Sequence, residues 1–324
     1  MNRVVVVVGA SSGIGRAAAL MLGGTREHLA LVARDEQALA STAAECTRAG
    51  AMSVSTHPVD IRDFDAVAEV MESVRATHGR IDALVNSAGV VAYGRFDEVP
   101  TEVWNGVLAT NVLGTANVCR AVLPDMRARN HGVIVLLGSV LGEIAVPTMS
   151  AYVVSKWAVR SLARELQLDN RDRPGVQISI VSPGGVDTPI YGLAANYLGV
   201  EGRPPPPVYS PQRVARSVVE QIDRPSKRVN VGVANPLMRL GFGLTPGLFD
   251  LVVGPLFARV ANARDPVEHR TGNVLDAVPG EAAERGGHGW GLAVIARDLT
   301  GDFAGALVNV LGRMPGRDGP PKDG

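Results

Sequence analysis

Short apolar runs alternate with stretches of helical periodicity from the start of the chain to about residue 225. The first run, Val4–Val8, contains only valines, and an unbroken β-branched run is typical of a strand buried on both faces. After it, apolar residues recur every three or four positions, which predicts a helix. Further strands are expected at 28–33, 52–57, 82–86, 132–138, 176–182 and 228–233, and helices at about 35–49, 63–78, 101–129, 149–170 and 211–221.

This alternation predicts the class of fold. Strands separated by helices form right-handed crossover units, which build a parallel sheet with helices on both faces. We therefore predict an α/β protein with a doubly wound, Rossmann-like parallel sheet of strand order 3-2-1-4-5-6-7. Ligands of such sheets bind beyond the carboxyl ends of the strands, so functional residues are expected in the loops that follow strands.

The composition changes near residue 200, since 14 of the 21 prolines lie beyond it. The run Pro204–Pro207 predicts a polyproline spacer across the surface. We expect a dinucleotide-binding and catalytic domain over residues 1–233 and a helical or irregular C-terminal extension over 234–324. Its segment 234–260 is strongly apolar, and its end, 313–324, is expected to be disordered. The apolar segment covers the pocket, forms a subunit contact or lies on a membrane surface; we favour packing against the protein itself.

Charge and composition exclude several classes of function. The 32 basic and 32 acidic residues balance, so nothing forms the basic field that nucleic acid requires. Cys46 and Cys119 fit neither a disulfide framework nor a metal motif, and the six histidines show no ligand spacing, so no metal is expected. No uncharged apolar run reaches the roughly 18 residues of a membrane span, and the Val4–Val8 run is too short for an export signal. We therefore expect a cytoplasmic protein.

Three glycines, Gly9, Gly13 and Gly15, lie where the first strand gives way to the first helix. Glycine there allows the backbone to approach a pyrophosphate, and the helix N-terminus offers free N–H groups and the positive end of its dipole. A plain tight turn is the alternative, and the glycines alone do not decide between the two.

A tyrosine and a lysine form a second candidate site. The chain has only three lysines against 29 arginines, and Lys156 follows Tyr152 by four residues, which places both on one helix face. A tyrosine pKa of about 10 is too high for proton transfer near neutrality, and a neighbouring ammonium group lowers it. Ser139 ends a buried run and can orient a carbonyl oxygen; the alternative is a serine that merely ends a strand.

The order and spacing of these motifs resemble the short-chain dehydrogenase/reductase family over residues 2 to about 225. Two positions depart from the family pattern, Val8 in place of threonine and Ser87 in "NSAG" in place of "NNAG", and neither is catalytic. The motifs that carry the resemblance are Gly-x3-Gly-x-Gly at 9–15, "NSAG" at 86–89, Asn111, Ser139, "YVVSK" at 152–156 and "SPGGVDT" at 182–188.

The resemblance implies a role for each motif residue. Tyr152 is the general acid/base, and Lys156 lowers its pKa and binds the nicotinamide ribose. Ser139 fixes the reacting oxygen, and Asn111 holds a water in a proton relay. The family usually forms homodimers or homotetramers, often through the helices that correspond to 101–129 and 149–170. The implied cofactor-binding residues are Gly9, Ser11, Ser12, Gly13, Ile14, Gly15, Asp60, Ile61, Asn86, Ala88, Gly89, Tyr152, Lys156, Pro183, Gly184 and Thr188.

The end of the second strand indicates which nicotinamide cofactor is used. An acidic residue there would bind the ribose 2′-hydroxyl of NAD and repel a 2′-phosphate. The chain has Ala33 followed by Arg34, and a cation without the acid favours NADP over NAD. Asp35 opens a helix, so we expect it to serve as the helix cap.

The substrate is the least specified part of the prediction. In the family, the segment corresponding to Pro189–Pro207 closes over the substrate, and here it carries Tyr191 among other apolar residues. We therefore expect a lipophilic ketone, aldehyde or alcohol in contact with Ser139, Tyr152 and Tyr191; simple packing of the loop is the alternative. The predicted function is an NADP(H)-dependent oxidoreductase. Its alternatives are a non-catalytic dinucleotide-sensing protein and a lipid-modifying reductase at a membrane surface.

Overall fold

The structure is a computed structural model that describes residues 2–251, 257, 262–280 and 282–287. The end at 313–324, expected to be disordered, lies outside the described residues, as do 252–256 and 258–261 of the apolar segment. The boundary expected after residue 233 stays a prediction.

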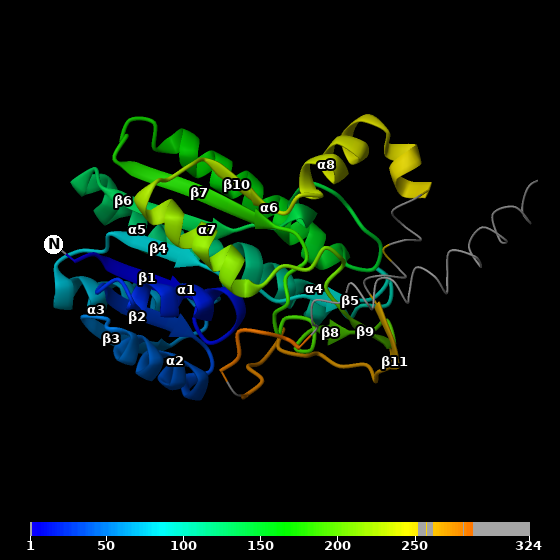
Figure 1. The fold of residues 1–324 in the computed structure, drawn as a ribbon, viewed down its shortest axis with the longest axis horizontal. Helices are drawn as coiled ribbons and strands as arrows, with labels where there is room; N and C mark the ends of the chain where they lie inside the picture. Colours follow the sequence, from blue (N-terminus) through cyan, green and yellow to red (C-terminus); the bar gives the residue numbers. More distant parts are fainter. Residues whose placement is uncertain (1, 252–256, 258–261, 281, 288–324) are drawn as a thin grey trace, which may run out of the picture. The chain divides into compact units, whose positions relative to one another are not determined.

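A parallel sheet of seven strands forms the centre of the molecule (Figure 1). Its spatial order is β10-β7-β6-β4-β1-β2-β3, which confirms the predicted order when these seven strands are counted along the chain. The strands are β1 (Val4–Val8), β2 (His28–Ala33), β3 (Ser53–Pro58), β4 (Ala83–Asn86), β6 (Gly132–Leu137), β7 (Val176–Pro183) and β10 (Arg228–Val231).

The valines of β1 alternate between two hydrophobic cores, one on each face of the sheet. Val4, Val6 and Val8 pack in one core, and Val5 and Val7 pack in the other. A strand buried on both faces explains why its sequence shows no polar alternation. The first core is covered by α3 (Phe64–His78), α5 (Thr115–Arg129) and α6 (Ser150–Asp169), and the second by α1 (Gly13–Gly23), α2 (Glu36–Ala49) and α7 (Pro211–Asp223).

Side-chain caps fix the starts of several helices. The carboxylate of Asp35 accepts a hydrogen bond from the Ala38 N–H and thus caps α2. Asp63 and Ser210 cap α3 and α7 in the same way. Such caps satisfy N–H groups that have no partner inside the helix, which is why the helix starts could be read from the sequence.

The expected helix at 101–129 is a single run of three parts: α4 (Thr101–Leu108), a π-helical stretch (Ala109–Gly114) and α5. By length and composition alone this run could cross a membrane, but half of its most apolar window is buried inside the protein. Because α5 residues pack directly on the central sheet, the run serves as a core helix of this fold.

Short strands hold the loops beyond the carboxyl end of the sheet. β5 (Ala92–Tyr93) pairs with β8 (Ala195–Asn196), and β9 (Val200–Gly202) pairs with β11 (Asn262–Pro266). Pro204 is buried and Pro206 is exposed, so the proline run lies only partly on the surface.

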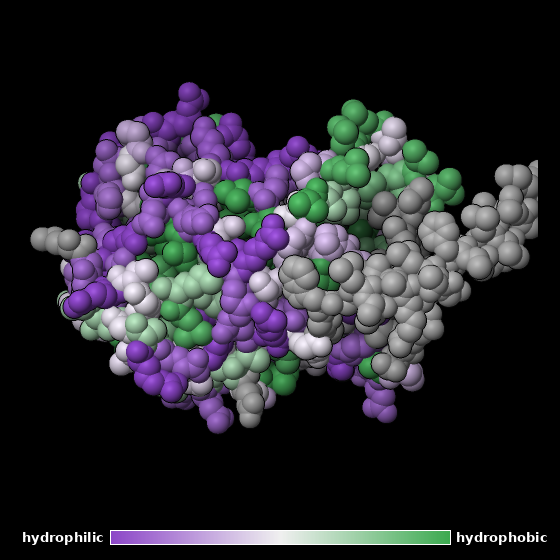
Figure 2. All heavy atoms as spheres, viewed as in Figure 1, coloured by the Kyte–Doolittle hydropathy of each residue, from purple (hydrophilic) through white to green (hydrophobic). Residues whose placement is uncertain are grey.

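The helix α8 (Asn235–Leu244) has two different apolar faces. Met238 and Phe242, together with Phe249 after the helix, pack against a cluster that includes Tyr152 and Tyr191. The opposite side is exposed and forms the apolar patch seen over α8 in Figure 2. The expectation that this segment packs against the protein therefore holds for one face only. The exposed patch consists of Leu237, Leu240, Leu244, Leu248 and Leu251.

Candidate active site

The glycine loop lies between β1 and α1 and depends on glycine at two positions. Gly9 has a φ of +79°, and a Cβ atom there would lie 2.6 Å from the Ala88 nitrogen. A Cβ atom on Gly15 would overlap the carbonyl oxygen of Gly9. Because glycine has no Cβ atom, α1 starts closer to β1 than any other residue type at these two positions would permit.

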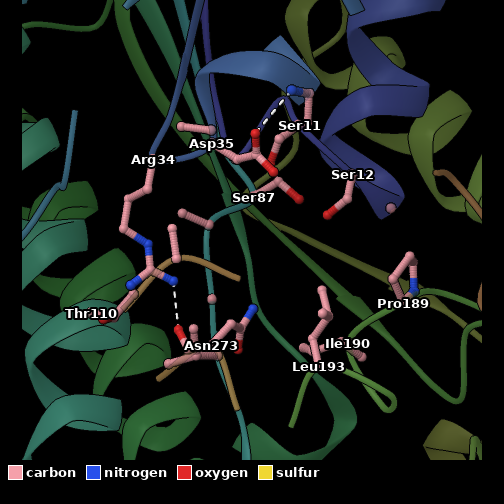
Figure 3. A pocket seen from close by; sticks show the side chains of 18 of the residues that line it. Ser11, Ser12, Arg34, Asp35, Ser87, Thr110, Pro189, Ile190, Leu193 and Asn273 are labelled. Atoms are coloured by element: carbon pink, nitrogen blue, oxygen red, sulfur yellow. Dashed lines mark hydrogen bonds between the residues drawn. The ribbon is translucent and has the colours of Figure 1, made fainter. Parts of the chain in front are cut away.

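An open cleft with a volume of about 280 Å³ lies at the carboxyl ends of β1, β2, β3 and β4 (Figure 3). It is lined by residues from the glycine loop, from the ends of these strands and from the loop after β7. The residues predicted to bind the cofactor that line the cleft are Gly9, Ser11, Ser12, Gly13, Ile14, Arg34, Asp60, Ile61, Ala88, Gly89 and Thr188.

Four other residues predicted to bind the cofactor lie behind or beside this cleft. Gly15 is buried beneath the loop. The Asn86 amide donates to the Thr115 hydroxyl (2.9 Å) and accepts from the Ala88 N–H (3.3 Å), so it braces the end of β4. Pro183 ends β7, and the Gly184 N–H donates to the Val231 carbonyl. Their contact with a cofactor stays a prediction.

Two arginines and an aspartate form the charged end of the cleft, where the adenosine half of the cofactor is predicted to bind. Arg62 donates to the Asp60 carboxylate through Nε (2.9 Å) and Nη2 (2.6 Å). Arg34 Nη1 lies 3.9 Å from the same carboxylate and donates no hydrogen bond to any described residue. Burial alone would raise the Asp60 pKa, but the bonds from Arg62 and the charge of Arg34 lower it below its ordinary value. Burial also lowers the pKa of Arg34.

Asp35 caps α2, as the sequence predicts, and both of its carboxylate oxygens are hydrogen-bonded. One carboxylate oxygen caps α2, and the other accepts a hydrogen bond from the Gly280 N–H at 3.2 Å. Both oxygens of the carboxylate that follows β2 are thus bonded to backbone N–H groups of the described residues.

Ser139, Tyr152 and Lys156 come together deeper in the molecule. Lys156 lies one helical turn after Tyr152 on α6, with its Nζ 5.5 Å from the centre of the Tyr152 ring. The Lys156 ammonium donates to the Leu137 carbonyl at 3.0 Å, and the Ser139 hydroxyl donates to the Tyr152 phenol. Ser139 follows β6 and accepts from the Leu141 N–H. The structure thus places three of the four predicted catalytic side chains in one cluster; the fourth, Asn111, is described below.

Burial opposes charge on both members of this Tyr–Lys pair. It raises the pKa of Tyr152 to about 12, and the bond from Ser139 offsets only part of that rise. Burial lowers the pKa of Lys156 to about 8. Neither shift brings the Tyr152 pKa toward neutrality in the protein by itself, because low-polarity surroundings disfavour phenolate and ammonium alike. The role of Lys156 in lowering the Tyr152 pKa stays a prediction.

Asn111 lies in the π-helical stretch and acts as a brace. Its amide accepts from the Val90 N–H (2.8 Å) and donates to the Val90 carbonyl and the Ser155 hydroxyl (both 2.9 Å). Its carbonyl accepts from the Thr115 hydroxyl at 2.6 Å. These bonds fix α6 against the segment after β4. A role of Asn111 in a proton relay stays a prediction.

The substrate side of the cluster is apolar. Tyr191 packs with Tyr152 among residues of the 3-10 turn Val140–Gly142, of α6 and of α8. Tyr93 is fully enclosed, and burial raises the pKa of Tyr93 and of Tyr191 well above the ordinary tyrosine value. The contact of Tyr191 with substrate stays a prediction.

Several lining residues were missed by the sequence analysis. Ser87, Thr110 and Ile190 lie next to predicted motif residues, so proximity to a motif could have identified them. Asn273, Ala277, Val278 and Gly280 also line the cleft, but they carry no local motif and lie far along the chain from it. Among the described residues, no three His, Cys, Asp or Glu side chains form a group that could hold a metal ion.

Comparisons with known proteins agree with this geometry. A family model described as short chain dehydrogenase matches residues 3–195. An uncharacterized oxidoreductase of Staphylococcus saprophyticus is 35% identical over 191 residues, which cover 59% of this chain and 81% of that protein. Dehydrogenase/reductase SDR family member 7B of Bos taurus is 29% identical over 263 residues, covering 76% and 79%.

A solved structure shows the same fold. The alcohol dehydrogenase from the archaeon Thermococcus sibiricus, complexed with 5-hydroxy-NADP, is 29% identical with a TM-score of 0.61, covering 71% of this chain and 94% of its own. The family match spans the glycine loop, the Ser139–Tyr152–Lys156 cluster and most of the central sheet. The chain therefore belongs to the short-chain dehydrogenase/reductase family, whose members are NAD(P)-dependent oxidoreductases that act on CH–OH and C=O groups.

Proposed function

We propose that the enzyme transfers a hydride between NADP(H) and a lipophilic ketone, aldehyde or secondary alcohol. The observation that carries this proposal is the cluster of Ser139, Tyr152 and Lys156, in which Tyr152 packs against a group of apolar side chains. A proton donor, a hydroxyl that can hold an oxygen, and a buried cation are the groups that carbonyl reduction requires.

The cleft fits a dinucleotide with a 2′-phosphate. The loop at Gly9 and Gly15 approaches α1 closely, which leaves space for phosphates at the helix N-terminus. Arg34 offers a buried Nη1 donor that has no hydrogen-bond partner among the described residues and lies 3.9 Å from the Asp60 carboxylate. The nearby carboxylates are bonded to Arg62 or cap α2, so NADP suits this end of the cleft better than NAD.

The predicted residues divide into two groups along a bound cofactor. The loop, Arg34 and Asp60 would hold its adenosine and phosphates, and Thr188, Tyr152 and Lys156 its nicotinamide half. When bound, the nicotinamide donates or accepts the hydride. Lys156 alone does not offset the burial that keeps the Tyr152 phenol neutral.

The protein groups support reduction at neutral pH. With a pKa of about 12, Tyr152 keeps its proton and can donate it to a carbonyl oxygen as that oxygen gains negative charge. Ser139 would hold the same oxygen, and Lys156 would stabilise the phenolate that remains. General acid catalysis of this kind contributes about 10²–10⁴-fold to the rate.

We also propose a cytoplasmic homodimer or homotetramer. Both cysteines are free and buried, which suits a reducing compartment. Leu113 beside α5 and Val154 and Leu168 on α6 are exposed apolar residues, and these helices are the contact elements that the family resemblance implies. A subunit interface would bury them.

A second candidate, a reductase that draws its substrate from a lipid surface, is favoured by one observation. The exposed leucines of α8 lie on the helix whose other face contacts the apolar cluster around Tyr152 (Figure 2). A helix with such a face can lie at the boundary of headgroups and acyl chains. This candidate keeps the same chemistry and changes the source of the substrate.

The first experiment is a titration of the purified full chain with NADPH and, separately, with NADH, followed by nicotinamide fluorescence. Tight binding of NADPH and weak binding of NADH would support the proposal. The reverse preference would assign NAD and refute the role given to Arg34. If neither binds, the cleft is not a dinucleotide site, and the proposed function is wrong. Oxidation of NADPH by apolar aldehydes and ketones then separates an enzyme from a dinucleotide-sensing protein.

A further inference from the structure

Asn273 joins the two walls of the cofactor cleft. Its carbonyl accepts a hydrogen bond from Arg34 Nη2 at 2.5 Å, and its N–H donates to the Leu193 carbonyl at 2.9 Å. Arg34 follows β2, whereas Leu193 belongs to the loop after β7. Figure 3 shows Asn273 between the two, with its side-chain amide directed into the cleft. One residue from the C-terminal part of the chain therefore crosses the mouth of the site.

The neighbouring residues continue this crossing. We call residues 271–280 the C-terminal strap. The Leu275 carbonyl accepts from Arg62 Nη2 at 2.7 Å, and the Gly280 N–H donates to the Asp35 carboxylate. The strap thus bonds to Arg34 and Arg62, which flank Asp60, and to Asp35, which follows Arg34.

A buried anchor holds the strap in place. Val274 is fully buried and packs with Val103 and Val107 of α4. A Cβ atom on Gly106 would lie only 2.8 Å from the Val274 side chain, so α4 is shaped to receive the strap. This close packing indicates that the strap has a fixed position against α4.

Two buried polar atoms next to the strap have no hydrogen-bond partner among the described residues: Asn273 Oδ1, and Arg34 Nη1, which has only the 3.9 Å ion pair with Asp60. One is a donor and the other an acceptor, and both residues line the cleft. Buried polar atoms are nearly always hydrogen-bonded, so the pair points to a ligand that carries both an anionic group and a hydroxyl or amino hydrogen. The phosphorylated ribose of NADP has both.

We propose that Asn273 is a cofactor-positioning residue, and that the C-terminal strap orients Arg34 toward the 2′-phosphate. The bond from Nη2 to the Asn273 carbonyl fixes the plane of the guanidinium group, which leaves Nη1 directed at the cleft; an ordered guanidinium binds phosphate better than a mobile one. The Asn273 amide oxygen accepts a hydrogen from the same ribose. This inference rests on the NADP preference proposed above.

The test is Asn273→Asp in the full chain, measured by fluorescence titration with NADPH and NADH. The substitution keeps the size of the side chain and the main-chain bonds but adds a negative charge beside the 2′-phosphate. We expect the Kd for NADPH to rise more than about tenfold and the Kd for NADH to change less than about threefold. Asn230→Asp, which adds the same charge at an exposed position on β10, should change neither.

A second pair of variants tests the strap itself. Gly272 has a φ of +53°, and a Cβ atom there would overlap the backbone of Leu193 and Ala194, so Gly272→Ala should displace the strap. Its matched control is Gly79→Ala after α3, where φ is also positive (+77°) but an added Cβ meets nothing within 4 Å. We expect Gly272→Ala to weaken NADPH binding more than NADH binding and to speed hydrogen exchange at Asn273, and Gly79→Ala to do neither.

The outcomes separate this inference from the proposed function. A wild-type chain that does not prefer NADPH would refute the proposed cofactor. If the wild type prefers NADPH and Arg34→Ala removes that preference, but Asn273→Asp and Gly272→Ala keep the wild-type ratio of Kd values, the strap inference alone is wrong. Tighter binding of both cofactors by Gly272→Ala would also overturn it, because the strap would then be an obstacle.

Discussion

The Ser139 hydroxyl hydrogen-bonds the Tyr152 phenol in surroundings that favour the neutral form of the phenol. Tyr152 retains some exposed surface, yet enough protein encloses the phenol to raise its pKa to about 12. The proton is thus held on Tyr152 until a partner with developing negative charge arrives. This arrangement suits a proton donor.

Tyr152→Phe should remove turnover and leave cofactor binding unchanged. The substitution deletes one hydroxyl that donates the proton, so we expect kcat for aldehyde reduction to fall by about 10²-fold or more. The Kd for NADPH, measured by fluorescence, serves as the control for folding. Unchanged turnover would refute the acid/base role of Tyr152.

Lys156→Met should stabilise the protein while it destroys activity. Burial lowers the Lys156 pKa from 10.5 to about 8, so below pH 8 the folded state holds a charge that its surroundings disfavour. We expect a gain of roughly 1–3 kcal/mol in the free energy of unfolding at pH 7, after the lost bond to Leu137 is subtracted. Urea denaturation of the cofactor-free chain measures it.

The same substitution has a predicted pH dependence. Between pH 8 and 10.5 the unfolded chain binds the Lys156 proton and the folded chain does not, so the stability of the wild type rises with pH in that window. The advantage of Lys156→Met should therefore shrink from pH 7 to pH 10. Lys227→Met, at an exposed position, should show no advantage at either pH. A constant advantage would contradict burial of the charge as its cause.

Gly15→Ala should abolish dinucleotide binding. The new Cβ atom would overlap the Gly9 carbonyl oxygen, so α1 has to move away from β1 and the loop loses its shape. Gly243→Ala on α8, where nothing lies within 4 Å of the added atom, is the control and should gain about 0.5–1 kcal/mol of stability. Fluorescence titration and urea denaturation give the two quantities. Wild-type affinity in Gly15→Ala would show that the loop does not bind the cofactor.

Leu240→Gln with Leu244→Gln should reduce binding to lipid vesicles if α8 lies on a membrane surface. Both side chains are more than half exposed, so their replacement costs little folding stability. Co-sedimentation with phospholipid vesicles measures the bound fraction, and NADPH oxidation with a water-soluble aldehyde should stay at the wild-type rate. Equal vesicle binding by variant and wild type would refute the lipid-surface candidate.

The sequence predicted the central sheet well because local patterns determine it. Val4–Val8 shows its burial by its lack of polar residues, and Asp35, Asp63 and Ser210 mark helix starts by the side-chain bonds they form. The placement of Ser139, Tyr152 and Lys156 in one cluster follows from the same patterns. Helical spacing puts Tyr152 and Lys156 on one face, and the end of β6 places Ser139 at the carboxyl edge of the sheet.

Other features depend on contacts that no local pattern encodes. β5 and β8 have two residues each and exist only because they pair with each other across the fold. Asn273 contacts Arg34 from 239 residues further along the chain. The pKa of Tyr152 depends on how much protein surrounds the phenol, so the sequence could identify the residue but not the sign of the shift.

The five identical valines of β1 have a consequence for how the glycine loop is positioned. A strand of one residue type packs equally well after a shift of two positions, so its side chains cannot set its alignment with β2 and β4. That alignment has to come from the ends. At one end the Asp82 carboxylate accepts from the Val4 N–H, and at the other the Gly9 N–H donates to the Val32 carbonyl. Asp82 lies at the amino ends of the strands, away from the cleft, and it thereby helps to set the position at which the glycine loop begins.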